Sequence, residues 1–232
     1  MKLSVMRRLV LVAMLVGIPI ANAVTTVPAG LNPGDQYRLA FVTSATRDAV
    51  STNVADYNSF VTGVASTSPD LLALGTNWAA IVTTSSVSAR DNTSTNPTVA
   101  TGVPIYLLNG SKVAESNADL WDGLLDSPLD ITELGNAIAP STWWVWTGTL
   151  SYGTIVGSTH LGSDGLSLAY TGITSFSAYQ WIEGSISFIG EPNHFYAISD
   201  TLTVQPVPVP PAAWLFGSAL GVMGWMRRKT QP

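Results

Sequence analysis

The stretch QYRLAFVT at residues 36–43 places an apolar side chain at every second position from Tyr37 to Phe41, which is typical of a strand with one buried face. Residues 53–65 follow with the apolar spacing of a short helix, and Asn53 or Ser51 can cap its first turn. Further strands are predicted, between long Gly-, Ser- and Asp-rich connections, at residues 78–83, 103–108, 143–147, 179–182 and 195–198. This order indicates an α+β fold with long loops and an irregular half toward the carboxyl end.

The composition excludes several kinds of site. Of the 232 residues, 46% are hydrophobic and only 11% are charged. The chain has no cysteine, which excludes disulfides, thiolate zinc sites, iron–sulfur ligation and cysteine nucleophiles. Its two histidines exclude a three-histidine metal centre. Because residues 24–204 contain no linker-like break, we expect one α+β domain there, between a leader at 1–23 and a tail at 205–232.

The leader has the order of a secretory signal peptide. Lys2, Arg7 and Arg8 precede an apolar run at residues 9–20, and Ala21-Asn22-Ala23 follows it. The apolar run is too short to cross a hydrocarbon core of about 30 Å as a helix. We therefore predict cleavage after Ala23, with Ala21 and Ala23 as the recognised small residues. An uncleaved amino-terminal anchor is the alternative.

The tail combines a proline-rich linker, an apolar segment and a basic end. The prolines at 206, 208, 210 and 211 disfavour a helix, so a helix can begin only near Ala212. Residues 212–226 would give about 22 Å of helix at about 1.5 Å per residue. The basic cluster that follows should remain cytoplasmic, which would leave the rest of the protein outside. The sequence thus predicts a carboxyl-terminal transmembrane helix.

This tail resembles the PEP-CTERM sorting signal, in the variant that opens V-P-L-P-A and continues W-L-F-G-S. Val209 stands where that variant has leucine, and Pro211 is inserted before the two alanines. The resemblance implies a Gram-negative bacterium, a membrane-anchored precursor, processing by an exosortase-type membrane protease, and delivery to the cell surface or extracellular matrix. A plain single-span anchor is the alternative. The residues that carry the resemblance are Val207, Pro208, Val209, Pro210, Trp214, Leu215, Phe216, Gly217, Ser218, Arg227, Arg228 and Lys229.

Removal of both ends changes the charge of the protein. Residues 24–204 retain four basic residues against fifteen acidic ones, a net charge of −11. Such a surface repels phosphate backbones, which argues against nucleic acid as a partner. It suits divalent cations, or the neutral sugars of an extracellular matrix.

The order of short motifs in residues 24–204 is similar to that of the C-type-lectin-like fold, in particular of endostatin-type domains. These motifs are Trp78-Ala79-Ala80, Val103-Pro104-Ile105-Tyr106, Asp119-Leu120-Trp121-Asp122-Gly123, Val145-Trp146-Thr147-Gly148 and Phe195-Tyr196-Ala197-Ile198. Members of that family are tied by disulfides, which this chain cannot form. The resemblance implies binding of a ligand or matrix rather than catalysis.

One acidic segment could hold a calcium ion. Carboxylates and amides at its density can supply the six to eight oxygens that calcium requires, although the spacing does not fit an EF-hand loop. In the alternative, these side chains cap turns through bonds to the backbone. Glu191-Pro192-Asn193 also copies a calcium- and sugar-binding tripeptide of lectins, but a turn before the last strand is the preferred interpretation. The candidate metal ligands are Glu115, Asn117, Asp119, Asp122 and Asp126.

The run Trp143-Trp144-Val145-Trp146 places Trp144 and Trp146 on one face of a strand. If this face were wet, the two indole rings could stack on sugar rings and bind a glycan. If it were dry, both rings would belong to the core. Trp121 is expected to pack beneath a polar turn.

The sequence carries no G-x-S-x-G elbow, H-E-x-x-H helix or phosphate-binding loop, so we expect no enzymatic activity. The function that these features favour is an exported, non-catalytic module that binds polysaccharide or matrix. Two alternatives are a calcium-assisted carbohydrate-binding module and an extracellular hydrolase. The hydrolase would use a pair of carboxylates, or a Ser–His–Asp relay through His160 or His194.

Overall fold

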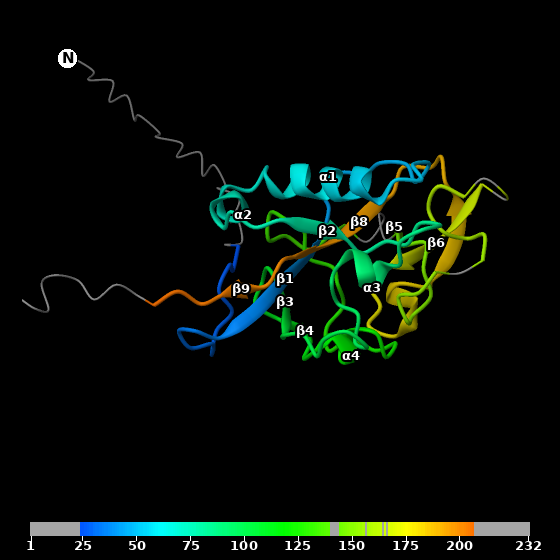
Figure 1. Cartoon of the computed structure of the whole chain (residues 1–232). Helices are drawn as coiled ribbons and strands as arrows, with labels where there is room; N and C mark the ends of the chain where they lie inside the picture. The colour runs from blue at the N-terminus through cyan, green and yellow to red at the C-terminus, as the bar shows by residue number, and fades with distance from the viewer. Residues whose placement is uncertain (1–23, 140–143, 156, 164, 166, 207–232) are drawn as a thin grey trace, which may run out of the picture.

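The computed structural model describes residues 24–139, 144–155, 157–163, 165 and 167–206. These residues form an α+β structure in which one large mixed sheet is accompanied by short helices (Figure 1). In chain order the elements are β1 (Gln36–Val42), α1 (Val54–Ala65), α2 (Pro69–Ala73), β2 (Trp78–Ala80), α3 (Ala89–Asn92), β3 (Ile105–Leu107), β4 (Lys112–Ala114), α4 (Asn117–Leu120), β5 (Trp144–Trp146), β6 (Leu168–Ile173), the 3₁₀ helix η1 (Tyr179–Trp181), β7 (Ser185–Phe188), β8 (His194–Ser199) and β9 (Leu202–Thr203).

The centre of the sheet is the pair β1 and β8. Along the sheet the strand order is β4-β3-β1-β8-β5-β6-β7, while β9 pairs with β1 and β2 pairs with β8. β1 runs antiparallel to β8 and parallel to β3. On the other edge of β8, β5 pairs with its first residues and β2 with its last ones. All six residues of β8 are consequently buried.

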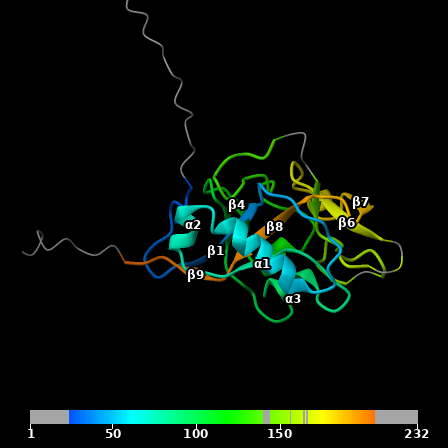
Figure 2. The ribbon, with the colours of Figure 1, turned by 90° about the horizontal axis from the view of Figure 1, so that it is seen from above.

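α1 covers one side of this central pair, as Figure 2 shows from above. The helix begins after Asn53, whose side-chain Oδ1 accepts a hydrogen bond from the Ala55 backbone N–H at 3.1 Å. Its buried face includes Tyr57 and Val61. The Tyr57 ring stacks on Phe195 of β8 with 5.4 Å between the ring centroids. The helix is thus held by the burial of its apolar face on the sheet.

The sheet continues through β5, β6 and β7 into a loop-rich half of the molecule. Here Trp181, which is fully buried, packs beside the rings of Trp121 and Tyr196. β6 passes this packed region so closely that a Cβ atom on Gly172 would lie 1.9 Å from the backbone oxygen of Trp181. Only glycine allows the two backbones to approach in this way.

Most of the predicted elements are present. Residues 36–43, 53–65 and 195–198 correspond to β1, α1 and β8, and the strands predicted at 78–83, 103–108 and 143–147 are present in shorter form. The strand predicted at 179–182 is wrong, because the chain forms the 3₁₀ helix η1 there and buries the consecutive residues Trp181 and Ile182. The carboxyl half is also less irregular than expected, since it contains β6 and β7.

Among the described residues, none of the helices combines the length and the apolar character that crossing a membrane requires. The signal peptide, the sorting segment and the transmembrane helix that the sequence predicts all lie outside the described residues.

The close approach at Gly172 leads to a test of stability. We expect Gly172→Ala to lower the free energy of unfolding by about 2 kcal/mol or more, because the methyl group meets backbone rather than a movable side chain. Gly190→Ala is the matched control, since nothing lies within 4 Å of a Cβ atom there. Urea unfolding followed by tryptophan fluorescence measures both. Equal midpoints for the two variants would contradict the packing described for β6.

Candidate functional site

The candidate calcium ligands form a network with Lys112 and the backbone. The Lys112 ammonium lies 2.5 Å from Glu115 Oε2 and 3.4 Å from Asp126 Oδ2. Asp119 accepts a hydrogen bond from the Glu115 backbone N–H at 2.6 Å, and Asp122 accepts one from the Leu124 N–H at 2.8 Å.

Asn117, the fifth candidate, lies apart from solvent. Its side chain is only 2% exposed and donates to the backbone oxygen of Ala100 at 2.8 Å. Within the described ranges, no group of three or more acidic or histidine side chains could hold a metal ion. The geometry therefore matches the turn-capping alternative. Binding of calcium by this segment stays a prediction.

The two candidate glycan-binding tryptophans are separated by burial. Trp144 is 41% exposed, whereas Trp146 is fully buried and donates its indole N–H to the backbone oxygen of Glu191 at 3.1 Å. β5 lies inside the sheet, between β6 and β8, and this position places Trp146 in the core. β5 therefore does not present two solvent-exposed tryptophan rings on one face. Trp121 is packed as expected, with its N–H 2.9 Å from Thr95 Oγ1.

Glu191 closes a turn with Phe188 through a backbone hydrogen bond of 3.0 Å, and Asn193, directly before β8, forms an antiparallel bridge with Arg47. Asn193 exchanges two backbone hydrogen bonds of 3.1 Å with Arg47. The remaining residues that the sequence singled out, Ala21, Ala23 and the sorting signal at 207–229, lie outside the described residues.

Both histidines bond to backbone oxygens. His194, which is buried, donates from Nδ1 to the oxygen of Thr43 at 2.6 Å, and His160 Nδ1 lies 2.9 Å from the oxygen of Leu161. In the part of the chain that the structure describes, neither ring is hydrogen-bonded to a serine hydroxyl or a carboxylate. Ser44 donates its hydroxyl and its N–H to the buried carboxylate of Glu133 instead.

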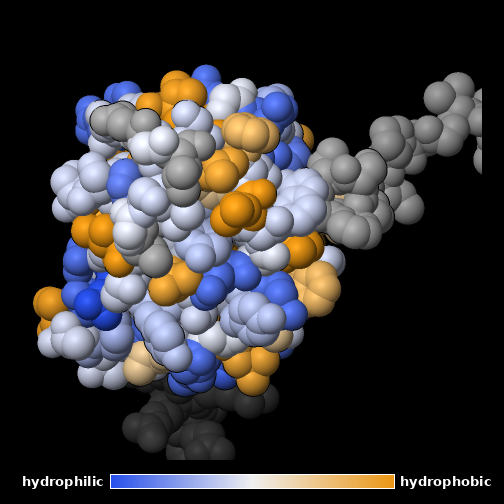
Figure 3. Space-filling view, turned by 90° about the vertical axis from the view of Figure 1, so that its right-hand side faces the viewer, coloured by the Kyte–Doolittle hydropathy of each residue, from blue (hydrophilic) through white to orange (hydrophobic). Residues whose placement is uncertain are grey.

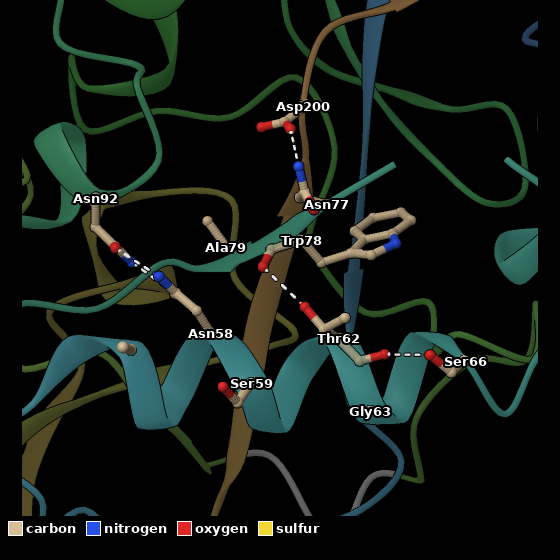
Figure 4. A pocket seen from close by; sticks show the side chains of 11 residues that line it. Asn58, Ser59, Thr62, Gly63, Ser66, Asn77, Trp78, Ala79, Asn92 and Asp200 are labelled. Carbon is tan, nitrogen blue, oxygen red and sulfur yellow. Dashed lines mark hydrogen bonds between the residues drawn. The ribbon is translucent and has the colours of Figure 1, made fainter. Parts of the chain in front are cut away.

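A polar groove lies between α1 and β2 (Figure 4), with a volume of about 670 Å³. Two asparagines hold its walls together: the Asn58 and Asn92 amides donate to one another at 2.9 Å in each direction. Both also bond to the backbone of Ala80, whose N–H donates to Asn58 Oδ1 at 2.8 Å and whose oxygen accepts from Asn92 at 2.7 Å. The backbone N–H and oxygen of Ala80, at the edge of β2, are thereby hydrogen-bonded to side chains.

Exposed aromatic side chains gather in a different part of the chain. The strongly exposed aromatic rings among the described residues all belong to residues 144–188, and they are Trp144, Tyr152, Phe176, Tyr179 and Phe188. In Figures 1 and 2 this half of the molecule, with β6, lies on the side away from α2 and β9. Figure 3 faces that side and shows hydrophobic residues in several separate groups among polar ones. Trp144 and Phe188 lie beside opposite ends of β6, so we give the name aromatic side to the other three rings, Tyr152, Phe176 and Tyr179.

Three loops support the aromatic side. The Leu125 N–H donates to the Ser177 oxygen at 2.7 Å, and the Ser151 N–H donates to Glu183 at 3.0 Å. A Cβ atom on Gly123 would lie 3.9 Å from the Cβ atoms of both Ser151 and Tyr179. The loops that carry Tyr152, Phe176 and Tyr179 are therefore neighbours.

Comparison with known proteins adds no relative: no protein-family model matches the chain, and no curated protein is significantly similar to it.

Sequence reasoning missed both the groove and the aromatic side. The groove depends on Asn58 and Asn92, which lie 34 positions apart and meet only in the fold. Tyr152 and Phe176 are isolated in loop segments, where periodicity gives no information about exposure, and Tyr179 begins η1, where the sequence predicted a strand. The one available signal was the presence of large aromatic residues within Gly- and Ser-rich connections.

The buried position of His194 leads to a prediction about pH. Burial lowers the pKa of His194 below its ordinary value, so the unfolded chain binds the proton more readily than the folded chain. The contribution of His194 to stability is consequently lost as the pH falls below about 6.5.

We expect the melting temperature of the unmodified chain to fall more between pH 7 and pH 5 than that of His194→Asn, whose amide can donate to Thr43. Circular dichroism melts at pH 7, 6 and 5 measure the two slopes. A His194→Asn slope as steep as that of the unmodified chain would contradict this assignment.

Proposed function

We propose that this chain is an exported protein of the cell surface or extracellular matrix of a Gram-negative bacterium, and that residues 24–204 bind polysaccharide without catalysis. The observation that carries the binding proposal is the aromatic side. Tyrosine, tryptophan and phenylalanine rings stack on the apolar faces of pyranose sugars, and exposed rings on neighbouring loops can contact successive sugar units.

The electrostatics favour a neutral ligand. Residues 24–204 carry a net charge of −11, which disfavours polyanions. Three of the four cations are also occupied. Lys112 pairs with Glu115 and Asp126, Arg47 lies 3.9 Å from Asp48, and buried Arg38 donates to the Thr93 oxygen at 2.6 Å. We therefore expect neutral glycans to be preferred over uronic-acid polymers.

A C-type-lectin-like fold is part of the proposal. It is supported by the order of the motifs in the sequence and by an α+β sheet whose second half carries long loops. In this proposal the loops of the aromatic side provide the ligand contacts, and the central pair of strands supports them.

Export and sorting rest on the two ends of the chain. The leader would be removed after Ala23, and the tail would hold a precursor in the membrane through its carboxyl-terminal helix until an exosortase-type protease releases it to the surface. The support is the order of linker, W-L-F-G-S segment and Arg227-Arg228-Lys229.

Deletion of residues 207–232 tests the sorting proposal. In a Gram-negative host with an exosortase-type protease, we expect the truncated chain to be absent from the cell surface, because it lacks the segment that the protease handles. Immunoblots of surface, periplasmic and medium fractions measure this. Equal accumulation of the truncated and the full-length chain at the surface would show that the tail is not a sorting signal.

Replacement of Tyr152 and Tyr179 by alanine tests the binding proposal. We expect the double variant to bind neutral polysaccharide about tenfold more weakly, equivalent to about 1.4 kcal/mol, because two stacking rings are removed. Retardation in native gels that contain β-glucan, mannan or galactan measures the apparent affinity. Val99→Ala is the control, since Val99 is 80% exposed and lies outside the aromatic side. Unchanged retardation of the double variant would exclude these rings from the site.

A further inference from the structure

We infer that the groove between α1 and β2 is a second binding site for a neutral, hydroxyl-rich chain, and that the protein can therefore cross-link polysaccharide. The cross-linking part of this inference rests on the proposed function of the aromatic side. The groove itself is argued from its own shape, side chains and charge.

The groove is part of a longer depression in the surface. A second recess of about 800 Å³ shares Asn77 and Asp200 with it and extends along residues 201–205. A third recess shares Thr62, Ser66 and Trp78 with the groove. These adjoining recesses, which we call the trough, suit an extended chain better than a compact small molecule.

The α1 wall of this trough lacks large side chains. Ala55, Ser59 and Gly63 lie at intervals of four residues, and all three are exposed. Gly63 is in the helix interior, where glycine costs about 1 kcal/mol relative to alanine. Nothing lies within 4 Å of a Cβ atom at Gly63, so no described part of the fold requires the missing side chain. The space remains open for a molecule that approaches the helix from outside.

The polar groups of the trough are fixed in place and retain free capacity. Asn58 uses one of its two amide hydrogens on Asn92, and Figure 4 shows the two side chains pointing at one another. Asp200 accepts from Asn77 through Oδ2 at 2.9 Å, which leaves its other carboxylate oxygen as an acceptor. Sugar hydroxyls both donate and accept, so they can bond to the Asn58 amide, the Ser59 hydroxyl and Asp200 together. Because hydrogen bonds already hold Asn58 and Asp200 in place, binding loses little side-chain entropy at these two residues.

The charge of the trough disfavours anionic ligands. Asp200 is the one charged side chain among the described residues that line the groove. A polyanion meets this carboxylate and the net charge of −11, and it finds no cation there. A neutral polyol meets neither penalty.

The groove and the aromatic side cannot hold the same sugar unit. The groove lies along the length of α1 and beside β2, whereas the aromatic side belongs to the connections of β6 (Figures 1 and 2). Two sites on different sides allow one protein to join two glycan chains, with the gain in avidity that bivalent binding brings.

Gly63→Gln fills the groove without disturbing the fold, because glutamine is a better helix former than glycine and has open space there. Gly63→Ala is the matched control. With the full-length protein in mild detergent, gel retardation by β-glucan, mannan or galactan measures binding, and the light scattering of protein–polysaccharide mixtures measures cross-linking. We expect Gly63→Gln to scatter at least tenfold less than Gly63→Ala, with a melting temperature no lower than that of the unmodified chain.

The Tyr152→Ala, Tyr179→Ala chain separates the two proposals. We expect this double variant to retain some retardation by the neutral polysaccharides, because the groove is intact. Addition of Gly63→Gln to the double variant should remove this residual retardation. If Gly63→Gln changes neither scattering nor residual retardation, the groove inference is overturned and the aromatic side stands. If Gly63→Gln alone removes all retardation, the groove stands and the proposed role of the aromatic side fails. Retardation by polygalacturonate instead of the neutral polymers, or no retardation of the unmodified chain, would overturn both.

Discussion

The antiparallel pairing of β1 with β8 is the interaction on which the rest of the structure depends. Ala40, Phe41 and Val42 pair with Ile198, Ala197 and Tyr196, and all of these residues are buried. The second edge of β8 then carries β5 at one end and β2 at the other. Removal of this pair would separate β3 and β4, which join the sheet through β1, from β5, β6 and β7, which join it through β8. Burial of apolar surface on both faces supplies the driving force.

The two candidate binding regions follow from the two ends of β8. At its carboxyl end, β8 pairs with β2 and leads into Asp200, which places the carboxylate and Asn77 at the groove beside α1. At its amino end, β8 supports β5 and through it β6, whose connections carry Tyr152, Phe176 and Tyr179. A rigid strand thus positions loops and a helix whose surfaces remain free to bind, as is common for functional loops on a sheet.

The acidic composition is explained in large part by turns. Asp35 accepts from the Asn32 N–H, Asp91 from Ser88 and Asn96, and Asp119 from the Glu115 N–H. The bonds from Ser88 and Asn96 hold the pKa of Asp91 below its ordinary value. A carboxylate that accepts backbone or hydroxyl hydrogens stabilises a loop in the absence of any metal. A dense run of Asp and Asn is therefore an ambiguous signal for calcium, and spacing alone could not decide between the two interpretations.

The amino-acid sequence by itself determined the α+β class, α1 with a cap at Asn53 or Ser51, and the strands β1 and β8, because alternation, helical spacing and capping are local properties; the structure shows Asn53 as the cap. It also determined the charge of residues 24–204 and the signal-like order of both ends. Only the tertiary structure decided that Trp146 is buried while Trp144 is exposed, that residues 179–182 form η1, and that Asn58 meets Asn92. These outcomes depend on which distant segments cover a side chain, and contacts of that kind leave no periodic signal in the sequence.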